Sequence, residues 1–356
     1  MKSTPEIAIA GRLISSDASP YVIAEVSANH NGSIQTAMRL IEAAKLAGAD
    51  AVKLQTYRPD TITLNSNAEQ FRISGGLWDG RSLYDLYQEA HMPWEWHAPL
   101  FELAARIGIT IFSSPFDFTA VDLLEGLDAP AYKIASFEAV DLPLIKRVAA
   151  TGKPVIISTG MADADEIGEA IAAAREGGCT QLAILHCISA YPALSSDYNL
   201  RTIPDMMNRF GVVTGLSDHT IDNTVAISSI ALGAAIIEKH FTLDRNGGGP
   251  DDSFSLEPAG LTALCRDARV AWEALGRVDY GLKSCEQGNV KFRRSLYVTR
   301  DVRAGEVAGP DNVRSVRPGY GLACKHLDEV LGQRFTRNVA AATPLEWDMF
   351  QLASQH

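Results

Sequence analysis

The chain has 356 residues, 46% of them hydrophobic, and a formal net charge of -11. Lysine and arginine are spread along it without a basic block, which argues against a nucleic-acid-binding protein. No apolar run approaches the ~20 residues needed to cross a bilayer, and the N-terminus lacks a basic-then-apolar signal, so no membrane partner is expected.

Short apolar runs alternate with helical patterns over most of the chain. The predicted strands are Tyr21–Ser27, Ala51–Thr56, Ile109–Pro115, Ala131–Ser136, Pro154–Thr159, Gln181–Ser189, Val212–His219 and Ala235–Thr242. The predicted helices are Ile34–Ala47, Trp94–Ile107, Thr119–Leu127, Leu142–Ala150, Asp165–Glu176, Leu200–Arg209, Asn223–Gly233 and Pro258–Leu275. Eight strands, each followed by a helix, predict a (β/α)8 TIM barrel, and the lack of a Gly-rich phosphate-binding fingerprint argues against an open doubly wound sheet.

One insertion interrupts this alternation. Residues 57–92, between the second strand and its helix, are far longer than an ordinary loop of a β/α barrel. Their aromatic residues either pack the loop onto the barrel rim or form a lid that selects the substrate, and both interpretations stay open.

The pattern changes after Gly276. Residues 280–290 are polar and turn-rich, and the runs Ser295–Val298 and Arg334–Val339 that follow are typical of strands. We therefore expect a barrel domain over 1–279, a linker over 280–290, and a small, mostly β domain over 291–356. The five cysteines are odd in number, widely spaced and without a CxxC pair, which predicts reduced thiols and a cytoplasmic protein.

Two neighbouring predicted strands carry a histidine at or near their carboxyl end, His219 and His240. Catalytic residues of a TIM barrel lie at the carboxyl ends of its strands, so both imidazoles should reach the same rim. Two neutral imidazoles can hold a divalent cation and leave coordination positions open for a substrate. A single histidine at a strand end is more often a hydrogen-bonded surface residue, so it is the pairing that favours a metal site.

Two lysines, Lys53 and Lys133, lie within otherwise apolar strands. A buried ammonium without a counter-anion costs several kcal/mol, so we predict that both bind an anion such as a phosphorylated carboxylate. Lys239 has the opposite strand parity to its neighbours and is predicted to face outward. Residues i and i+2 share one face of a strand. The pairs predicted to share the barrel mouth are Lys53 with Gln55, Ser217 with His219, and Glu238 with His240.

Several stretches at these strand ends resemble a known family. They are Ala28-Asn29-His30-Asn31-Gly32, Val52-Lys53-Leu54-Gln55, Ser114-Pro115-Phe116-Asp117, Tyr132-Lys133-Ile134-Ala135-Ser136, Leu185-His186-Cys187, Gly215-Leu216-Ser217-Asp218-His219-Thr220 and Glu238-Lys239-His240-Phe241-Thr242. Together they resemble the phosphoenolpyruvate-condensing nonulosonate synthases, the sialic acid synthase family, over about Tyr21 to Gln351. The stretch Arg317-Pro318-Gly319-Tyr320-Gly321 resembles the antifreeze-like (SAF) domain of that family, and the insertion resembles its pseudaminic acid synthase branch most closely.

The resemblance implies a role for individual residues. His219 and His240 would be metal ligands, usually for manganese, with magnesium or cobalt as alternatives. Those implied to hold phosphoenolpyruvate are Lys53, Ser114, Lys133, Ser136, Ser158, Ser189 and Ser217. Those implied to face the sugar are Glu25, Gln55, Tyr191, Asp251 and Arg317, and the catalytic set would be Glu25, Lys53, Lys133, His219 and His240. Ser189 is a departure, because sialic acid synthases usually carry Asn there.

The implied reaction condenses phosphoenolpyruvate with the open-chain aldehyde of an N-acetylated amino sugar and releases phosphate by C–O cleavage. In the pseudaminic acid branch, that sugar is 2,4-diacetamido-2,4,6-trideoxy-L-altrose. The insertion is expected to supply the apolar surface for it, from Phe71, Leu77, Trp78, Tyr84 and Tyr87. The resemblance also implies a domain-swapped homodimer, in which Arg317 serves the site of the partner subunit.

Three alternatives remain at this point. The sugar could be that of an N-acetylneuraminate or legionaminate synthase. A metal-dependent sugar isomerase on the same barrel could use two histidines and a carboxylate, but it would not need two buried lysines. A non-catalytic sugar-binding barrel would not need the set formed by Lys53, Lys133, His219 and His240. Fold class alone does not choose among them.

Overall fold

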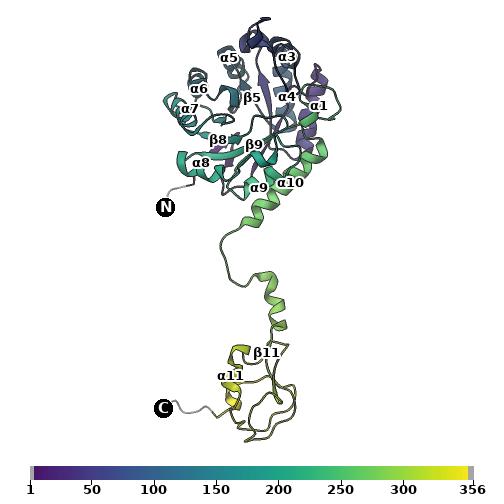
Figure 1. The fold of residues 1–356 in the computed structure, drawn as a ribbon, viewed down its shortest axis with the longest axis vertical. Coiled ribbons are helices and arrows are strands. Elements are labelled where there is room, and N and C mark those ends of the chain that lie inside the picture. Colours follow the sequence, from purple (N-terminus) through teal and green to yellow (C-terminus); the bar gives the residue numbers. More distant parts are fainter. Residues whose placement is uncertain (1–3, 352–356) are drawn as a thin grey trace. The chain divides into compact units, whose positions relative to one another are not determined.

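The computed structural model shows eight parallel strands that close into a barrel in the first part of the chain (Figure 1). They are β3 (Tyr21–Glu25), β4 (Ala51–Thr56), β5 (Thr110–Pro115), β6 (Tyr132–Ile134), β7 (Val155–Ser158), β8 (Leu182–Cys187), β9 (Val213–Asp218) and β10 (Ile236–His240). Each pairs with the next in chain order, and β10 closes the circle by pairing with β3. The predicted TIM barrel is confirmed.

Helices surround this barrel and cover its outer face (Figure 1). They are α1 (Ile34–Ala47), α4 (His97–Ile107), α5 (Phe118–Gly126), α6 (Leu142–Ala149), α7 (Ala164–Glu176), α8 (Thr202–Phe210), α9 (Thr224–Ile230) and α10 (Pro258–Leu275). α1 shows how the sequence sets the bounds: the Ser33 hydroxyl accepts from the Thr36 N–H at one end, and Gly48 closes the other at φ 92°. The apolar stripe between these caps packs on the strands.

A hairpin that the sequence analysis did not anticipate precedes the barrel. Its strands are β1 (Ile7–Ile9) and β2 (Arg12–Ile14), paired antiparallel. Ile7, Ile9 and Ile14 are buried in one cluster with Tyr21 and other residues at the amino ends of the barrel strands. The hairpin therefore closes that end of the barrel, and the carboxyl ends of the strands form the open mouth.

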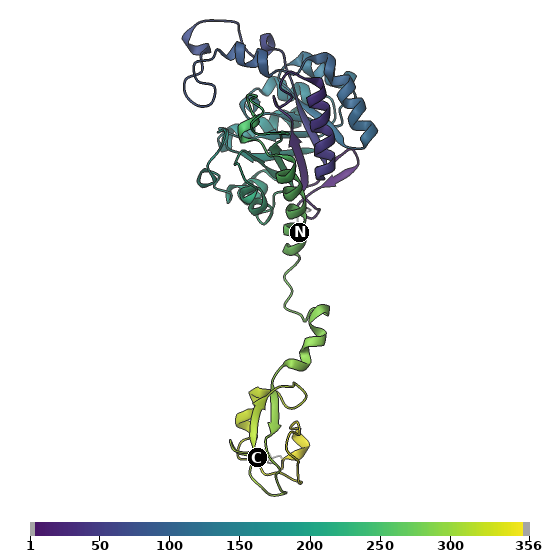
Figure 2. The same ribbon diagram turned by 90° about the vertical axis from the view of Figure 1, so that its right-hand side faces the viewer.

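The insertion between β4 and α4 projects from the barrel (Figure 2). It contains α2 (Pro59–Ile62), the 3₁₀ turn Glu69–Phe71 and α3 (Leu83–Ala90), and a second 3₁₀ turn, Trp94–Trp96, leads into α4. The indole N–H of Trp78 donates to the Pro250 carbonyl at 3.2 Å. The rings of Tyr57 and Tyr87 meet edge to face at 5.7 Å. These contacts anchor the insertion on the rim.

The chain divides into two units, Met1–Gly276 and Arg277–His356. The structure describes residues 4–351, so the ends of the two predicted domains, residues 1–3 and 352–356, lie outside the described residues. In the second unit the 3₁₀ helix Ser284–Phe292 occupies most of the segment predicted as a linker. Among the described residues, no helix combines the length and the apolar character that a membrane span requires.

The second unit holds one regular sheet, formed by β11 (Ser295–Val298) and β12 (Val313–Val316), with α11 (Leu327–Val330) beside it in the chain. The prediction of a strand over 334–339 was wrong. Arg334 and Val339 each make an isolated bridge, to Val307 and Val302. The segment instead supplies Phe335 and Val339 to the apolar core of this unit, so burial rather than a regular ladder explains its apolar pattern.

Candidate active site

Four charged side chains meet inside the mouth of the barrel. Lys53 lies 2.5 Å from a Glu25 carboxylate oxygen and 3.8 Å from Glu238. Lys133 lies 3.3 Å from the same oxygen of Glu238. All four side chains are nearly inaccessible to water. The two lysines predicted to bind an anion are therefore adjacent, and carboxylates of the protein partly neutralise them.

Burial and neighbouring charges set the protonation of this cluster. Burial raises the pKa of Glu25 to about 7, against the opposing effect of Lys53. Burial also opposes ionisation of Glu238, but the charges of Lys133 and Lys53 outweigh it and hold the pKa of Glu238 below its usual value. The pKa of Lys133 is lowered, mainly by burial. A site with these properties favours a bound anion, since an added negative charge stabilises both ammonium groups.

Serine hydroxyls surround the two lysines. The Lys53 Nζ donates to the Ser114 hydroxyl at 3.2 Å, and the Lys133 Nζ donates to the Ser158 hydroxyl at 2.6 Å. The Ser217 hydroxyl donates to Glu238 at 3.3 Å. Each of these serines stands at or near the carboxyl end of its strand, as predicted.

Ser136 and Ser189 form a second group of hydroxyls beside the first. The Gly160 N–H donates to the Ser136 hydroxyl at 3.2 Å, and a side chain at Gly160 would collide with both serines. The Ser189 hydroxyl is buried without a hydrogen-bond partner. An unpaired buried hydroxyl next to a side-chain-free position provides a donor and the space for a ligand oxygen.

His219 and His240 lie together at the mouth, with ring centroids 5.3 Å apart. The Nδ1–H of His219 donates to the Ile188 carbonyl at 2.7 Å, so Nε2 carries the free lone pair that can bind a metal. The Nδ1 of His240 is buried without a partner. Burial holds the pKa of His240 well below its usual value, and the nearby ammonium groups of Lys53 and Lys133 lower it further, so that ring is neutral.

This donor set fits a divalent cation. In the described part of the chain, no group of three or more His, Cys, Asp and Glu side chains gathers as a complete metal site. Two imidazoles alone leave most coordination positions to substrate oxygens and water, which suits a catalytic rather than a structural ion. His186, by contrast, contacts the Tyr198 carbonyl at 2.5 Å and is a satisfied histidine, as predicted.

A cavity of about 440 Å³ opens beside His240. The Gln55 amide donates to Glu25 and to the Ser27 hydroxyl, both at 3.0 Å. The Ser27 hydroxyl in turn donates to Asp251 at 2.5 Å, and the Tyr191 ring lies 4.4 Å from that of His219. Of the residues predicted to face the sugar, Gln55, Tyr191 and Asp251 line this cavity. Glu25 does not line it and touches it only through Gln55, and Arg317 belongs to the second unit.

Two acidic residues of the site were missing from the predicted set. Glu238 was placed in the mouth by strand parity but was given no role, although it contacts both lysines. Glu138 lines the cavity with one carboxylate oxygen unpartnered, and burial raises its pKa to about 7. The signal for Glu138 is its place two residues after Ser136, just beyond the motif that runs from Tyr132 to Ser136.

The apolar wall of the cavity differs in part from the prediction. Trp78 and Tyr87 line it, whereas Phe71, Leu77 and Tyr84 do not. The reason is the face of α3 that turns inward: Leu83, Leu86, Tyr87 and Ala90 follow helical spacing and line the cavity. Tyr84 falls outside this stripe, and Leu77 is 51% exposed. Ile62 and Ile73 complete the wall.

Charged and imidazole side chains gathered at the carboxyl ends of the strands are the arrangement of a TIM barrel enzyme. Residues 40–280 match the NeuB family and residues 293–351 match the SAF domain. The chain belongs to the NeuB family.

Individual relatives refine this assignment. The pseudaminic acid synthase of Helicobacter pylori is 44% identical over 331 residues, covering 92% of this chain and 97% of its own. The N,N'-diacetyllegionaminic acid synthase of Campylobacter jejuni is 35% identical, covering 89% and 96%. Among solved structures, the spore coat polysaccharide biosynthesis protein SpsE of Bacillus subtilis matches with a TM-score of 0.67 at 33% identity, covering 98% of this chain and 100% of its own. The resemblance drawn from the strand-end motifs is confirmed.

Proposed function

We propose that this protein is a pseudaminic acid synthase, a transferase that condenses phosphoenolpyruvate with 2,4-diacetamido-2,4,6-trideoxy-L-altrose. Water adds at carbon 2 of phosphoenolpyruvate, and phosphate leaves by C–O cleavage. The observation that carries the proposal is the buried pair Lys53 and Lys133, set among hydroxyls beside the two histidines. The identity to pseudaminic acid synthases supports the choice of branch. Five free thiols support a reducing, cytoplasmic compartment.

Different residues of the site would bind phosphoenolpyruvate and the sugar. Lys53 and Lys133 would bind the phosphate and carboxylate of phosphoenolpyruvate, with Ser114 and Ser158 completing their hydrogen bonds. Glu25, with a pKa of about 7, can take up or release a proton near neutral pH, beside the Gln55 amide that would orient the sugar.

A divalent cation, manganese by the family resemblance, would be held by His219 and His240. When bound, it would act as a Lewis acid on the aldehyde oxygen of the open-chain sugar. Asp251 lies 4.0 Å from the Nδ1 of His240 and would position the sugar, or a water molecule, next to that ion.

The sugar preference can be measured directly. N-acetylmannosamine has a terminal hydroxyl and lacks the 4-acetamido group, whereas the proposed sugar has a methyl group and a second amide. The apolar wall of Ile73, Trp78 and Leu86 favours the methyl, and buried polar groups left unpaired by the wrong sugar cost more than a misplaced methyl does. We expect kcat/KM to favour the diacetamido sugar by about a hundredfold or more.

The test is phosphate release with phosphoenolpyruvate, manganese and a panel of amino sugars that includes the legionaminic acid precursor. A preference for N-acetylmannosamine or for that precursor would assign the protein to another branch and leave the condensation chemistry standing. No phosphate release with any sugar would favour a non-catalytic sugar-binding barrel.

We further propose that the active unit is a homodimer in which Arg317 reaches the sugar of the partner subunit. Consecutive loops at the mouth each expose at least one large apolar side chain, and a face of this kind favours a protein partner. These residues are Phe118, Phe137, Val140, Met161, Leu194 and Ile221, each at least 48% exposed. Arg317 and Tyr320 are themselves exposed on the second unit, where a guanidinium can meet a substrate of the other subunit.

Mixing two inactive variants tests this sharing. In a hybrid of Arg317→Ala and Lys53→Ala subunits, a site shared between subunits gives one complete active centre, so we expect recovery of up to about a quarter of wild-type activity after random exchange. Mixing Lys53→Ala with Glu25→Ala is the control, since both defects lie in the barrel and no site is restored. Verified exchange without recovery in the first mixture would place Arg317 outside the partner's site.

A further inference from the structure

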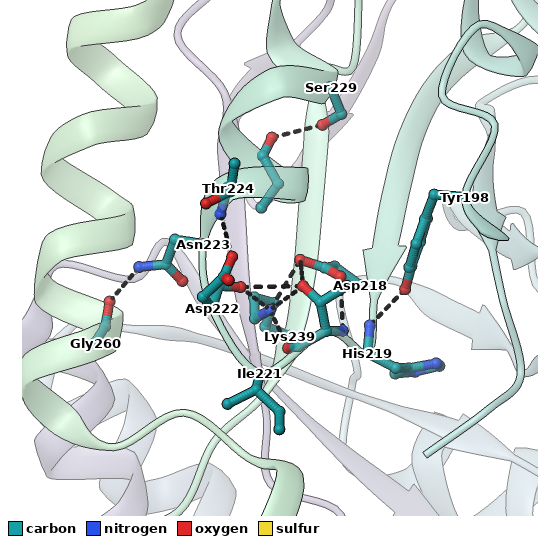
Figure 3. Close-up of polar contacts among 12 residues, drawn as sticks. Tyr198, Asp218, His219, Ile221, Asp222, Asn223, Thr224, Ser229, Lys239 and Gly260 are labelled. Carbon is teal, nitrogen blue, oxygen red and sulfur yellow. Dashed lines mark hydrogen bonds and ion pairs between the residues drawn. The ribbon is translucent and has the colours of Figure 1, made fainter. Parts of the chain in front are cut away.

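Lys239 stands between Glu238 and His240 on β10, with its side chain on the opposite face of the strand. It points away from the barrel mouth, as strand parity predicts, yet it is only 2% exposed. Its Nζ donates to the Asp218 carboxylate at 2.8 Å and to the carbonyls of Thr220 and Asp222, each at 2.7 Å (Figure 3). An ammonium has three N–H donors, and each of them has a partner here.

These three acceptors bracket His219 in the chain. Asp218 precedes it, Thr220 follows it, and Asp222 lies in the same loop. Asp218 also accepts from the Thr220 N–H at 2.9 Å and from the Thr220 hydroxyl at 3.1 Å. Asp218 is paired in register with Lys239 across the two strands. The Lys239 ammonium therefore ties the backbone on both sides of His219 to the neighbouring strand.

A second group holds His219 itself. The His219 N–H donates to the hydroxyl of Tyr198 at 2.7 Å, and Tyr198 is fully buried (Figure 3). The imidazole is fixed by its own bond to the Ile188 carbonyl. The ring is therefore set by the Ile188 carbonyl, and the backbone that carries it is set by Lys239 and Tyr198.

We propose that Lys239 is a positioning residue for His219, with Tyr198 as its second support, and that together they set the His219 ring for the divalent cation. This inference rests on the metal site of the proposed function. The outer face of a barrel strand ordinarily packs apolar side chains against helices, and an apolar residue there is often as stabilising as a buried ion pair. A buried ammonium with this set of acceptors fixes one loop geometry, and that loop carries a predicted ligand.

Manganese binding to the full-length, chelator-treated protein tests the idea without any turnover. Titration followed by the electron paramagnetic resonance of free Mn²⁺ gives the dissociation constant. We expect Lys239→Met to weaken binding by about 10- to 100-fold, the range for groups that orient metal ligands. The visible absorption of bound Co²⁺ should change as well, because the geometry of the site changes.

Arg12→Met is the matched control. It breaks the ion pair between Arg12 on the hairpin and Asp50, whose charged atoms are 2.7 Å apart, and neither residue is near His219 or His240 in the sequence. It should lower thermal stability and leave manganese affinity unchanged. Tyr198→Phe removes only the hydroxyl that holds the His219 N–H, and it should weaken manganese binding severalfold. If Lys239→Met does not fold, this second variant tests the positioning role. Wild-type protein that binds no manganese would refute the metal site of the proposed function. Wild-type affinity in the folded variants would instead overturn the positioning role and leave the metal site intact.

Discussion

Replacing His219 or His240 with alanine should lower kcat/KM by at least about a hundredfold and remove bound metal. Lewis-acid stabilisation of developing charge is worth several kcal/mol, and each 1.4 kcal/mol is a tenfold change in rate. The two rings meet edge to face at the mouth, and neither belongs to the apolar cluster that closes the barrel. Circular dichroism and the oligomeric state should therefore stay as in the wild type.

His97 supplies a matched control for these two variants. It is fully buried, but its Nε2 contacts the Thr56 hydroxyl at 2.8 Å behind the strands rather than in the mouth. His97→Gln should cost stability and retain bound manganese. Activity equal to wild type in protein stripped of metal by a chelator, with the metal content measured, would end the assignment of His219 and His240 as catalytic ligands.

Strand parity explains why so much of the site could be predicted from the sequence. Along a barrel strand, residues that point inward alternate with residues that pack outward against the helices. The position of a polar residue in this alternation therefore predicts the face on which it lies. Parity predicts Lys53 and Glu238 in the mouth, the apolar surroundings of Lys133 predict an anion-binding role for it, and the contacts among the three agree. The ends of α1 are likewise set by local contacts, those of the capping residues Ser33 and Gly48.

What escaped prediction depends on contacts distant in sequence. Strand parity correctly predicted that Lys239 points out of the barrel. It could not show that the Asp218 carboxylate and two backbone carbonyls surround the Lys239 ammonium. The β1–β2 hairpin consists of three-residue strands, too short for a periodic signal, and its role in closing the barrel appears only once Ile9 meets the strand ends. Within the insertion, which aromatics line the cavity depended on the orientation of α3, so Tyr84 was misplaced and Leu86 was missed.

Lys133→Met should weaken phosphoenolpyruvate binding by roughly thirtyfold to several thousandfold. Removing one partner of a buried, hydrogen-bonded charge pair typically costs about 2–5 kcal/mol of binding, and each 1.4 kcal/mol is tenfold. The loss should appear in KM for phosphoenolpyruvate and in the thermal shift that this ligand produces. Lys153→Met, at a partly exposed ion pair with Glu125 and Asp128, is the control and should change neither quantity.

Glu238→Gln should act in the opposite direction on the same thermal shift. In the free protein, Glu238 is the carboxylate beside Lys133, and its replacement by glutamine leaves that buried ammonium beside two neutral groups, the new amide and the Ser158 hydroxyl. Breaking a buried pair in this way costs about 3–5 kcal/mol, so the free variant should be much less stable than the wild type. Phosphoenolpyruvate brings negative charge back to Lys133, so the ligand should raise the melting temperature of Glu238→Gln by more than it raises that of the wild type.

The two substitutions together separate an anion-binding mouth from a purely structural charge cluster. If the lysines served only the fold, both variants would lose stability and the ligand-induced shift would stay the same in each. If they bind phosphoenolpyruvate, Lys133→Met loses the shift and Glu238→Gln enlarges it. Differential scanning calorimetry with and without phosphoenolpyruvate, in the absence of sugar, measures this contrast. Equal shifts in both variants and the wild type would remove Lys133 and Glu238 from the phosphoenolpyruvate site.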